Sequence, residues 1–359
     1  MAYDLTRKLK EIEAYEPAVP DFKIRLDANE SFIDIFKSVP ELGERILSEM
    51  KDIPVNRYPD SKAMELTAAF ADYYNIPLKY ITAGNGSDEL ISLIIGTLLS
   101  KGETLLTLSP DFSMYTFYGV LSEVNIYRMP KEENYTVNIQ KVIDYCNNNN
   151  VKAVIFSNPC NPTSLGIPRE DIIKLLKNLF CLVIVDEAYM DFWDQSVLDE
   201  VANYDNLIVL KTCSKAFGLA GMRVGFAVAG ETITNALRMA KSPYNVDVYS
   251  QIAAKNVLME KNLLRSFTEK IIESRKSLNK MLSELAVDSN LIDKVYESNT
   301  NFVFMRTKYA DKIYKGLCER SISIKRIGEN HLRITAGSYD ENTVLMAALM
   351  EINEDSQKS

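Results

Sequence analysis

Six short apolar runs, separated by segments with a helical pattern, most strongly limit what this chain can fold into. Each run is as long as a β-strand and lacks regular alternation of polar and apolar residues, which is typical of strands covered on both faces. Strands that alternate with helices predict an α/β fold with a mainly parallel sheet. The runs are Thr104–Leu108, Val124–Met129, Val151–Ser157, Cys181–Asp186, Leu207–Leu210 and Val224–Ala229.

Two of the intervening segments have clear helical patterns. Residues 169–180 follow Pro168 and carry acidic residues in the first turn, and residues 87–100 begin just after Gly86. After Tyr249 the pattern changes to one or two long helices, followed by a smaller mixture of strands and helices. The strands expected there are Asn301–Arg306 and His331–Thr335, and the helices are Tyr309–Arg320 and Glu341–Ile352.

These patterns divide the chain into three parts. Residues 1–35 have too little apolar pattern to fold alone, and we expect them to pack on the small domain. Residues 36–250 would form the large domain. Residues 251–359 would form a small α+β domain, with a long linking helix at about 250–285.

A single histidine, His331, among 359 residues restricts the chemistry. Ser-His-Asp hydrolysis could use only that residue, and a metal site with several histidine ligands is impossible. We expect no metal site, and we expect the catalytic base to be Lys, Tyr, Asp or Glu. The net charge of −8 is unfavourable for nucleic-acid binding, which needs clustered positive charge.

The five cysteines lie far apart and include no CxxC pair. This spacing favours a reducing compartment over a zinc ribbon or a disulfide scaffold. No apolar run is long enough to span a membrane, and the first residues lack the apolar core of a signal peptide. We therefore expect a cytoplasmic protein that binds no membrane.

The segment KTCSKAFGLAGMRVG, residues 211–225, is the strongest functional motif. Lys215 follows an apolar strand among small hydroxyl residues and glycines, and Arg223 comes eight residues later. Hydroxyl groups and a nearby arginine are suited to binding phosphate. Lys215 could then be a charge partner of the phosphate or a covalent anchor, whereas an isolated lysine would more often be a solvated loop residue.

Three further segments place polar groups near strand or helix ends. Asp186 ends an apolar strand, where open α/β sheets bind ligands, although a helix cap or a magnesium ligand would look the same. In AGNGSDEL, residues 83–90, glycines precede a helix whose first N–H groups could bind an anion. A Rossmann site is the weaker reading, because Glu89 replaces the last glycine and no strand–glycine–helix unit is expected before it. Asn161 lies in a turn-rich strand end.

Taken in this order, the motifs resemble those of the fold-type I pyridoxal-phosphate aminotransferases, and most closely those of the histidinol-phosphate aminotransferase family. The resemblance extends from about Leu26 to Gly337. It implies a large domain with a mainly parallel seven-stranded sheet between helices, and a smaller α+β domain. The matching motifs are NRYPD (56–60), GNGSDEL (84–90), DFSMY (111–115), NPT (161–163), DEAY (186–189), SKAFGLAGMRVG (214–225), SPYNV (242–246), NF (301–302) and LRIT (332–335).

The resemblance implies pyridoxal 5′-phosphate as the cofactor and assigns its contacts. Lys215 would bind it covalently and then act as base and acid, while Asp186 would pair with the ring nitrogen. Tyr189 and Asn161 would hydrogen-bond the ring hydroxyl, and Phe112 would stack on the ring. The phosphate would be held by the backbone of Gly86, Ser87 and Asp88 and by Thr212, Ser214 and Arg223, with Tyr58 reaching it from the other subunit of a homodimer.

Substrate contacts are implied at fewer positions. Arg333 would bind a substrate carboxylate with both guanidinium nitrogens, which lysine does less well. Tyr15 and Asn29 match positions near the substrate. The arginine that the family uses for the substrate phosphate aligns with Lys325 or is shifted to Arg326. Tyr115 and Tyr244 lie in matching motifs, but each is at least as well explained as a core or dimer-interface aromatic with no role in the chemistry.

The resemblance implies transfer of an amino group from L-histidinol phosphate, the small-molecule donor, to 2-oxoglutarate. An aromatic amino-acid aminotransferase and a threonine-phosphate decarboxylase use related sites and remain alternatives. A non-catalytic binding protein is a third alternative, although binding alone needs no lysine anchor. Two differences from the family concern substrate choice. The motif ANESF, residues 28–32, lacks the family's proline, and the glycine that follows NPT in the family is displaced.

Overall fold

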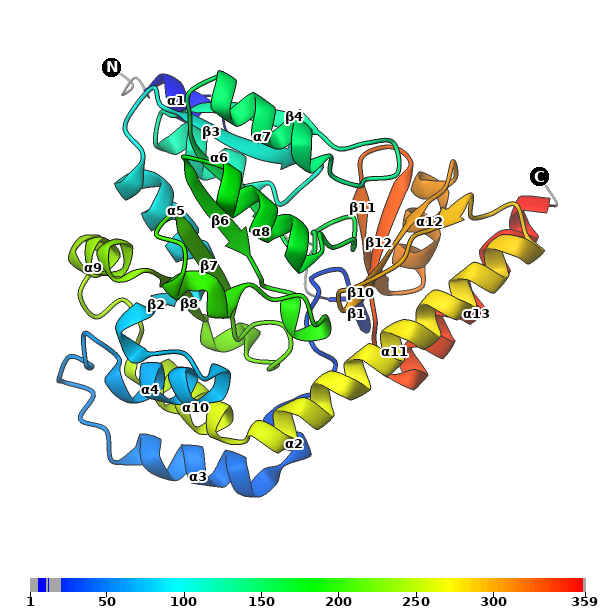
Figure 1. The fold of residues 1–359 in the computed structure, drawn as a ribbon. Helices are drawn as coiled ribbons and strands as arrows, with labels where there is room; N and C mark the ends of the chain where they lie inside the picture. The colour runs from blue at the N-terminus through cyan, green and yellow to red at the C-terminus, as the bar shows by residue number, and fades with distance from the viewer. Residues whose placement is uncertain (1–5, 11, 13–20, 358–359) are drawn as a thin grey trace, which may run out of the picture.

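The computed structural model describes residues 6–10, 12 and 21–357, and it contains two β-sheets joined by a long helix (Figure 1). The larger sheet has seven strands in the order β2-β8-β7-β6-β5-β3-β4. Only β8 runs antiparallel to its neighbours, so the sheet is mainly parallel, as predicted. Its strands are β2 (Ile81–Asn85), β3 (Thr104–Ser109), β4 (Asn125–Pro130), β5 (Val151–Ser157), β6 (Leu182–Asp186), β7 (Leu207–Thr212) and β8 (Val224–Ala229).

Helices cover both faces of this sheet, which explains why its central strands lack alternation. One face packs against apolar side chains such as Leu90, Tyr115 and Leu237 from the first group of helices. The other face packs against a second group, which forms the larger core cluster. The first group is α5 (Gly86–Leu98), α6 (Met114–Leu121) and α9 (Glu231–Ala240). The second is α3 (Pro40–Lys51), α4 (Met64–Tyr74), α7 (Ile139–Asn148), α8 (Arg169–Asn178) and α10 (Val248–Met259).

The smaller sheet has five strands in the order β1-β11-β12-β10-β9. Its edge strand β1 comes from the N-terminal segment and pairs in parallel with β11, near the other end of the chain. A separate core fills the space between this sheet and its helices. The strands are β1 (Ile24–Leu26), β9 (Lys294–Val295), β10 (Phe302–Arg306), β11 (Ile322–Ile327) and β12 (His331–Thr335), and the helices are α12 (Ala310–Glu319) and α13 (Tyr339–Gln357).

The expected long helical region is two helices, α10 and α11 (Lys261–Asp288), which meet at Glu260. The helix α11 reaches from the large sheet's helices to the small sheet, and α13 lies along it (Figure 1). The short helices α1 (Arg7–Lys10) and α2 (Ile35–Ser38) precede α3. The proposed domain boundaries stay predictions.

One strand of the large sheet was not predicted. The strand β2 leads directly into Gly86 and α5, so the motif at residues 83–90 spans the end of a strand and the start of a helix. This strand pairs only with the antiparallel β8, however, so the unit is not the parallel βαβ arrangement of a Rossmann site.

Within the described residues, no helix is long and apolar enough to cross a membrane.

Candidate active site

Three neighbouring parallel strands end side by side, and each ends on a polar residue. Ser157 ends β5, Asp186 ends β6 and Thr212 ends β7, and Ser157 lies directly opposite Asp186 in the ladder. Lys215 follows Thr212 in the loop after β7. Since open α/β sheets bind ligands at the carboxyl ends of their strands, these strand ends define the candidate site.

Asp186 is a buried carboxylate held by two hydrogen-bond donors. The Tyr115 hydroxyl donates to Oδ2 over 2.8 Å, and the backbone N–H of Ala188 donates to Oδ1 over 3.1 Å. Burial nevertheless raises the pKa of Asp186 to about 6. A carboxylate in such a place is stabilised by a cationic partner, so the site favours a ligand with a protonated nitrogen at this point.

Lys215 reaches into the same region from the loop after β7. Its Nζ donates to the backbone oxygen of Ala28 over 3.0 Å and lies 5.9 Å from the centre of the Tyr189 ring. Burial, and next the positive charge of Arg333, lower the pKa of Lys215 to about 8. A fraction of the side chain is therefore a neutral amine near pH 7, which is the nucleophilic form.

Tyr189 is held by a residue from the far end of the chain. The Asn29 Nδ2 donates to the Tyr189 hydroxyl over 2.8 Å, so the phenol proton can be donated in another direction. Asn29 has a left-handed backbone with φ of 54°, and its N–H donates to Thr335 Oγ1 over 3.0 Å. Asn301 Nδ2 donates to the Asn29 oxygen over 3.0 Å. The segment after β1 thus ties the small sheet to the site.

Arg333 lies on β12, and it is brought to the large sheet by a contact with Asn161. Its Nη1 donates to Asn161 Oδ1 over 2.5 Å, and its Nη2 donates to the backbone oxygen of Asp27. The guanidinium carbon lies 5.4 Å from the centre of the Phe302 ring. Arg333 is thereby fixed at the junction of the two sheets, where a guanidinium can bind a carboxylate or phosphate.

The N-terminus of α5 and Arg223 form an anion cradle. Gly86 has φ of +79°, and a Cβ added there would lie 2.6 Å from the Arg223 Nη2, so this position requires glycine. Arg223 Nη1 lies 3.4 Å from Ser214 Oγ, and the Ser214 N–H donates to Thr212 Oγ1 over 3.2 Å. Among the described residues, no carboxylate pairs with Arg223. Helix N–H groups beside an unneutralised guanidinium are suited to a phosphate.

Comparison with known proteins identifies the family. Residues 23–349 match the family described as aminotransferase class I and II. The histidinol-phosphate aminotransferase of Clostridium novyi (strain NT) is 38% identical over 360 residues, which cover 99% of each chain. The chain belongs to the histidinol-phosphate aminotransferase family of class I and II aminotransferases.

Solved structures of this family confirm the predicted fold-type I architecture. The histidinol-phosphate aminotransferase of Sinorhizobium meliloti, a complex with pyridoxal-5′-phosphate, superposes with a TM-score of 0.88 at 22% identity and covers 99% of each chain. That of Clostridium acetobutylicum has a TM-score of 0.83 at 25% identity over 92% of this chain and 99% of the other.

The side chains of this aminotransferase fit pyridoxal 5′-phosphate. The cradle at Arg223 offers donors to the phosphate, and the Asp186 carboxylate suits a protonated ring nitrogen. The amine of Lys215 can bond to an aldehyde carbon, while Tyr189 and Asn161 carry groups that can hydrogen-bond a ring hydroxyl. Asp88 fits only through its backbone, because its Oδ2 accepts from Tyr118 over 2.8 Å.

Tyr58 lies apart from this cluster within one chain, because it is 81% exposed and stacks on Tyr244 with ring centres 4.5 Å apart. Phe112 lies beside the cluster and packs edge-on against Tyr115, which holds Asp186, with ring centres 5.5 Å apart. Tyr15 lies outside the described residues.

The two candidate cations on β11 are clearly distinguished by their placement. Lys325 is directly opposite Arg333 in the antiparallel pair of β11 and β12, so the two side chains share one face of the small sheet. Arg326 is exposed, and its Nη1 lies 2.6 Å from Asp311 Oδ1 on α12.

A buried ion pair that the sequence did not reveal holds two of the predicted residues. Asp111 accepts hydrogen bonds from the Phe112 N–H over 2.8 Å and from the Ser157 hydroxyl. The Ser157 Oγ accepts in turn from the Asn161 N–H over 3.0 Å. Lys131 lies 3.8 Å from the Asp111 carboxylate, with both side chains almost fully buried. The only signal in the sequence was the place of Asp111 in the motif DFSMY.

Tyr115, in the same motif, was interpreted as a core or interface aromatic. It is fully buried, and its hydroxyl also holds Asp186. The neighbours of Asp186 and Thr212 in the chain form a second buried charge cluster, in which Lys211 Nζ lies 3.3 Å from the Asp191 carboxylate and 3.7 Å from that of Glu187. Both groups of buried charges flank strand ends that carry the predicted residues.

Proposed function

We propose that this aminotransferase moves the amino group of L-histidinol phosphate to 2-oxoglutarate, giving imidazole-acetol phosphate and L-glutamate in histidine biosynthesis. The observation that carries the choice of substrate is the cross-strand pair of Lys325 and Arg333. Two cations on one sheet face, beside Asn161, suit a phosphate dianion better than a single carboxylate. The name of the 38% identical relative from Clostridium novyi supports the same choice.

The bound pyridoxal phosphate would supply an electron sink that stabilises negative charge on the carbon bearing the amino group. Lys215 Nζ would take the proton from that carbon, because its lowered pKa leaves a neutral amine available. Asp186 would keep the ring nitrogen protonated. Tyr189 and Asn161 would orient the ring through its hydroxyl group.

Arg333 would serve both substrates in turn. The phosphate of L-histidinol phosphate would occupy the space beside Arg333, because this donor has no α-carboxylate. The carboxylate of glutamate or 2-oxoglutarate would take the same place in the second half-reaction. Lys325 would add charge for the phosphate, and Arg326 would contribute nothing, because it is held by Asp311 on the solvent side.

A homodimer with shared sites is part of this proposal. Tyr58 is exposed beside the exposed Tyr244, and Val55 and Met64 add exposed apolar surface to the same segment. Such a patch suits contact with a second copy of the chain, from which Tyr58 would reach the partner's phosphate cradle. A cytoplasmic location stays a prediction from the sequence.

The substrate assignment is tested by comparing amino donors with 2-oxoglutarate as acceptor. We expect the purified holoenzyme to form glutamate with a higher kcat/KM for L-histidinol phosphate than for phenylalanine or tyrosine. A preference for either aromatic amino acid would overturn the substrate while leaving the aminotransferase in place. Release of carbon dioxide from threonine O-phosphate would point to the decarboxylase alternative.

A further inference from the structure

A continuous network of hydrogen bonds leads from the buried pair of Asp111 and Lys131 to Arg333. The Ser157 hydroxyl donates to the Asp111 carboxylate, and the Asn161 N–H donates to the Ser157 Oγ over 3.0 Å. Arg333 Nη1 donates to the Asn161 Oδ1 over 2.5 Å. The network starts just beyond β3 and β4, passes the end of β5 and reaches β12, so it joins the two sheets.

The Asp111 carboxylate gives this network its direction. Its donors are the Ser157 hydroxyl, the Ser157 N–H and the Phe112 N–H, so each of them presents a proton to an ionised acceptor. Lys131 Nζ lies 3.8 Å from the carboxylate and offsets the cost of burying its charge. A serine hydroxyl has one proton, and Ser157 gives it to Asp111. The Ser157 oxygen is therefore left to accept from Asn161.

Asn161 transmits this order to Arg333 through two different groups. Its backbone N–H is held by Ser157, and its side-chain oxygen holds the guanidinium. The guanidinium has a second anchor at the backbone oxygen of Asp27, which follows β1 in the small sheet. One anchor thus comes from each sheet. Loss of the anchor on the large sheet would let the guanidinium turn away from an anion, and small misplacements of a binding group are costly.

We propose that Asp111 and Ser157 are positioning residues that set the affinity of the site for substrate anions, because they hold Asn161 where it orients Arg333. Neither residue touches the substrate. The inference rests on the proposed function, in which Arg333 binds the phosphate of L-histidinol phosphate and the carboxylate of glutamate in turn. Since one guanidinium serves both substrates, loss of the network should weaken the binding of both by a similar factor.

Calorimetric titration of the holoenzyme with succinate measures anion binding alone, because this dicarboxylate has no amino or keto group to react. We expect Ser157→Ala to raise the Kd for succinate by about fivefold, the typical effect of one lost hydrogen bond. The KM values for 2-oxoglutarate and L-histidinol phosphate should rise by a similar factor, while kcat changes by no more than roughly twofold. Asp111→Asn should act in the same direction. If Asp111→Asn does not fold because Lys131 loses its partner, Ser157→Ala, which keeps the ion pair, decides the matter.

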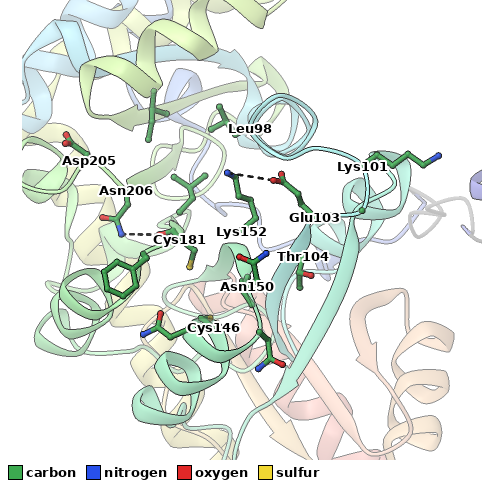
Figure 2. Close-up of a pocket in the computed structure, with 17 residues that line it drawn as sticks. Leu98, Lys101, Glu103, Thr104, Cys146, Asn150, Lys152, Cys181, Asp205 and Asn206 are labelled. Atoms are coloured by element: carbon green, nitrogen blue, oxygen red, sulfur yellow. Dashed lines mark hydrogen bonds and ion pairs between the residues drawn. The ribbon is translucent and has the colours of Figure 1, made fainter.

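The matched control removes hydrogen bonds at the other edge of the same sheet. Asn206 Nδ2 donates to the backbone oxygens of Leu179 and Cys181, each over 3.1 Å, beside a cavity at the amino ends of the strands (Figure 2). Asn206→Ala should lower the melting temperature and leave the Kd for succinate and both KM values near those of the wild type. A loss of stability is thereby separated from a loss of anion binding.

The outcomes distinguish this inference from the proposed function. If Ser157→Ala lowers the melting temperature but binds succinate as the wild type does, or if Asn206→Ala raises the Kd by the same factor, the positioning role is wrong. Arg333→Lys should raise the Kd for succinate more than Ser157→Ala does. Normal binding by Arg333→Lys would overturn the proposed role of Arg333 and this inference with it, whereas failure confined to Ser157→Ala and Asp111→Asn would leave that role intact.

Discussion

At the scale of single residues, the chemistry depends on two groups whose pKa values are shifted in opposite directions by burial. Burial lowers the pKa of Lys215 to about 8 and raises that of Asp186 to about 6. Both shifts move the groups toward their neutral forms, because a low-dielectric site disfavours charge. The neutral amine of Lys215 is the nucleophilic form, whereas the Asp186 carboxylate needs a cationic partner to stay ionised.

We expect Lys215→Ala to abolish turnover without unfolding the protein. The variant lacks the amine that we expect to act as the base. The single histidine of the sequence, His331, lies on β12 and is not among the site residues that could replace it. Steady-state assays and circular dichroism check this, with the exposed Lys79→Ala as a control. Near-normal turnover by pure Lys215→Ala would refute the role of Lys215.

Asp186→Asn should stabilise the cofactor-free protein at high pH while impairing catalysis. The folded-state pKa of Asp186, about 6, lies above its usual value of 3.8, so the folded state binds this proton more tightly than the unfolded state. The carboxylate therefore destabilises the fold fully above pH 6 and ceases to do so below pH 4. A difference of about two units corresponds to about 3 kcal/mol.

Urea unfolding of both proteins at several pH values measures this effect. The advantage of Asp186→Asn should be largest near pH 8 and should shrink as the pH falls through 6 toward 4. An advantage that is constant with pH would show that the folded-state pKa of Asp186 is not raised.

At the scale of elements, the pairing of β11 with β12 decides which cation faces the substrate. Lys325 shares a sheet face with Arg333, whereas the next residue, Arg326, points to the other face and pairs with Asp311. The sequence left these two residues as alternatives, because a shift of one residue in register exchanges the faces.

We expect Lys325→Ala to raise KM for L-histidinol phosphate by about tenfold or more, which corresponds to about 1.5 kcal/mol for a charge-assisted contact. The KM for an aromatic amino acid should change less. Arg326→Ala is the matched control and should leave both values near those of the wild type. Equal effects of Lys325→Ala on both donors would contradict a phosphate contact.

Elements that are continuous and apolar could be predicted from the sequence, and short or irregular ones could not. The strand β5 was predicted with its observed ends, and its residues are nearly all buried. The strand β2 has the sequence ITAGN, in which a glycine and an asparagine hide the strand pattern. The strand β1 has three residues and depends on β11, almost 300 residues away, for its partner.

The site residues that stand in local motifs could be predicted, and those that depend on contacts between distant segments could not. Lys215 and Asp186 stand out because they follow apolar strands in distinctive motifs. The role of Asp111 depends on Lys131, which follows β4, and on Ser157, which ends β5, and neither residue stands in a recognisable motif. Buried charges are paired by tertiary contacts, and a single sequence does not show those contacts.

At the scale of the whole molecule, the proposed dimer would bring the exposed Tyr58 of one chain to the phosphate cradle of the other. We expect an obligate homodimer, and we expect Tyr58→Phe to weaken cofactor retention by about 1.5–3 kcal/mol, the typical value of one hydrogen bond to a charged group. Sedimentation and cofactor dialysis check these expectations. A fully active monomer at assay concentration would refute the shared site.

The contacts at the junction of the two sheets also determine when the active site can form during synthesis of the chain. Asp27, Ala28 and Asn29 are synthesised about 300 residues before Arg333 and Thr335, which are among their partners. The strands of the large sheet are complete once Ala229 has been made, and domains tend to fold in the order of their synthesis. The early segment can therefore form these contacts only after Arg333 and Thr335 have been synthesised. The active site is consequently completed only after every strand of the large sheet has been made.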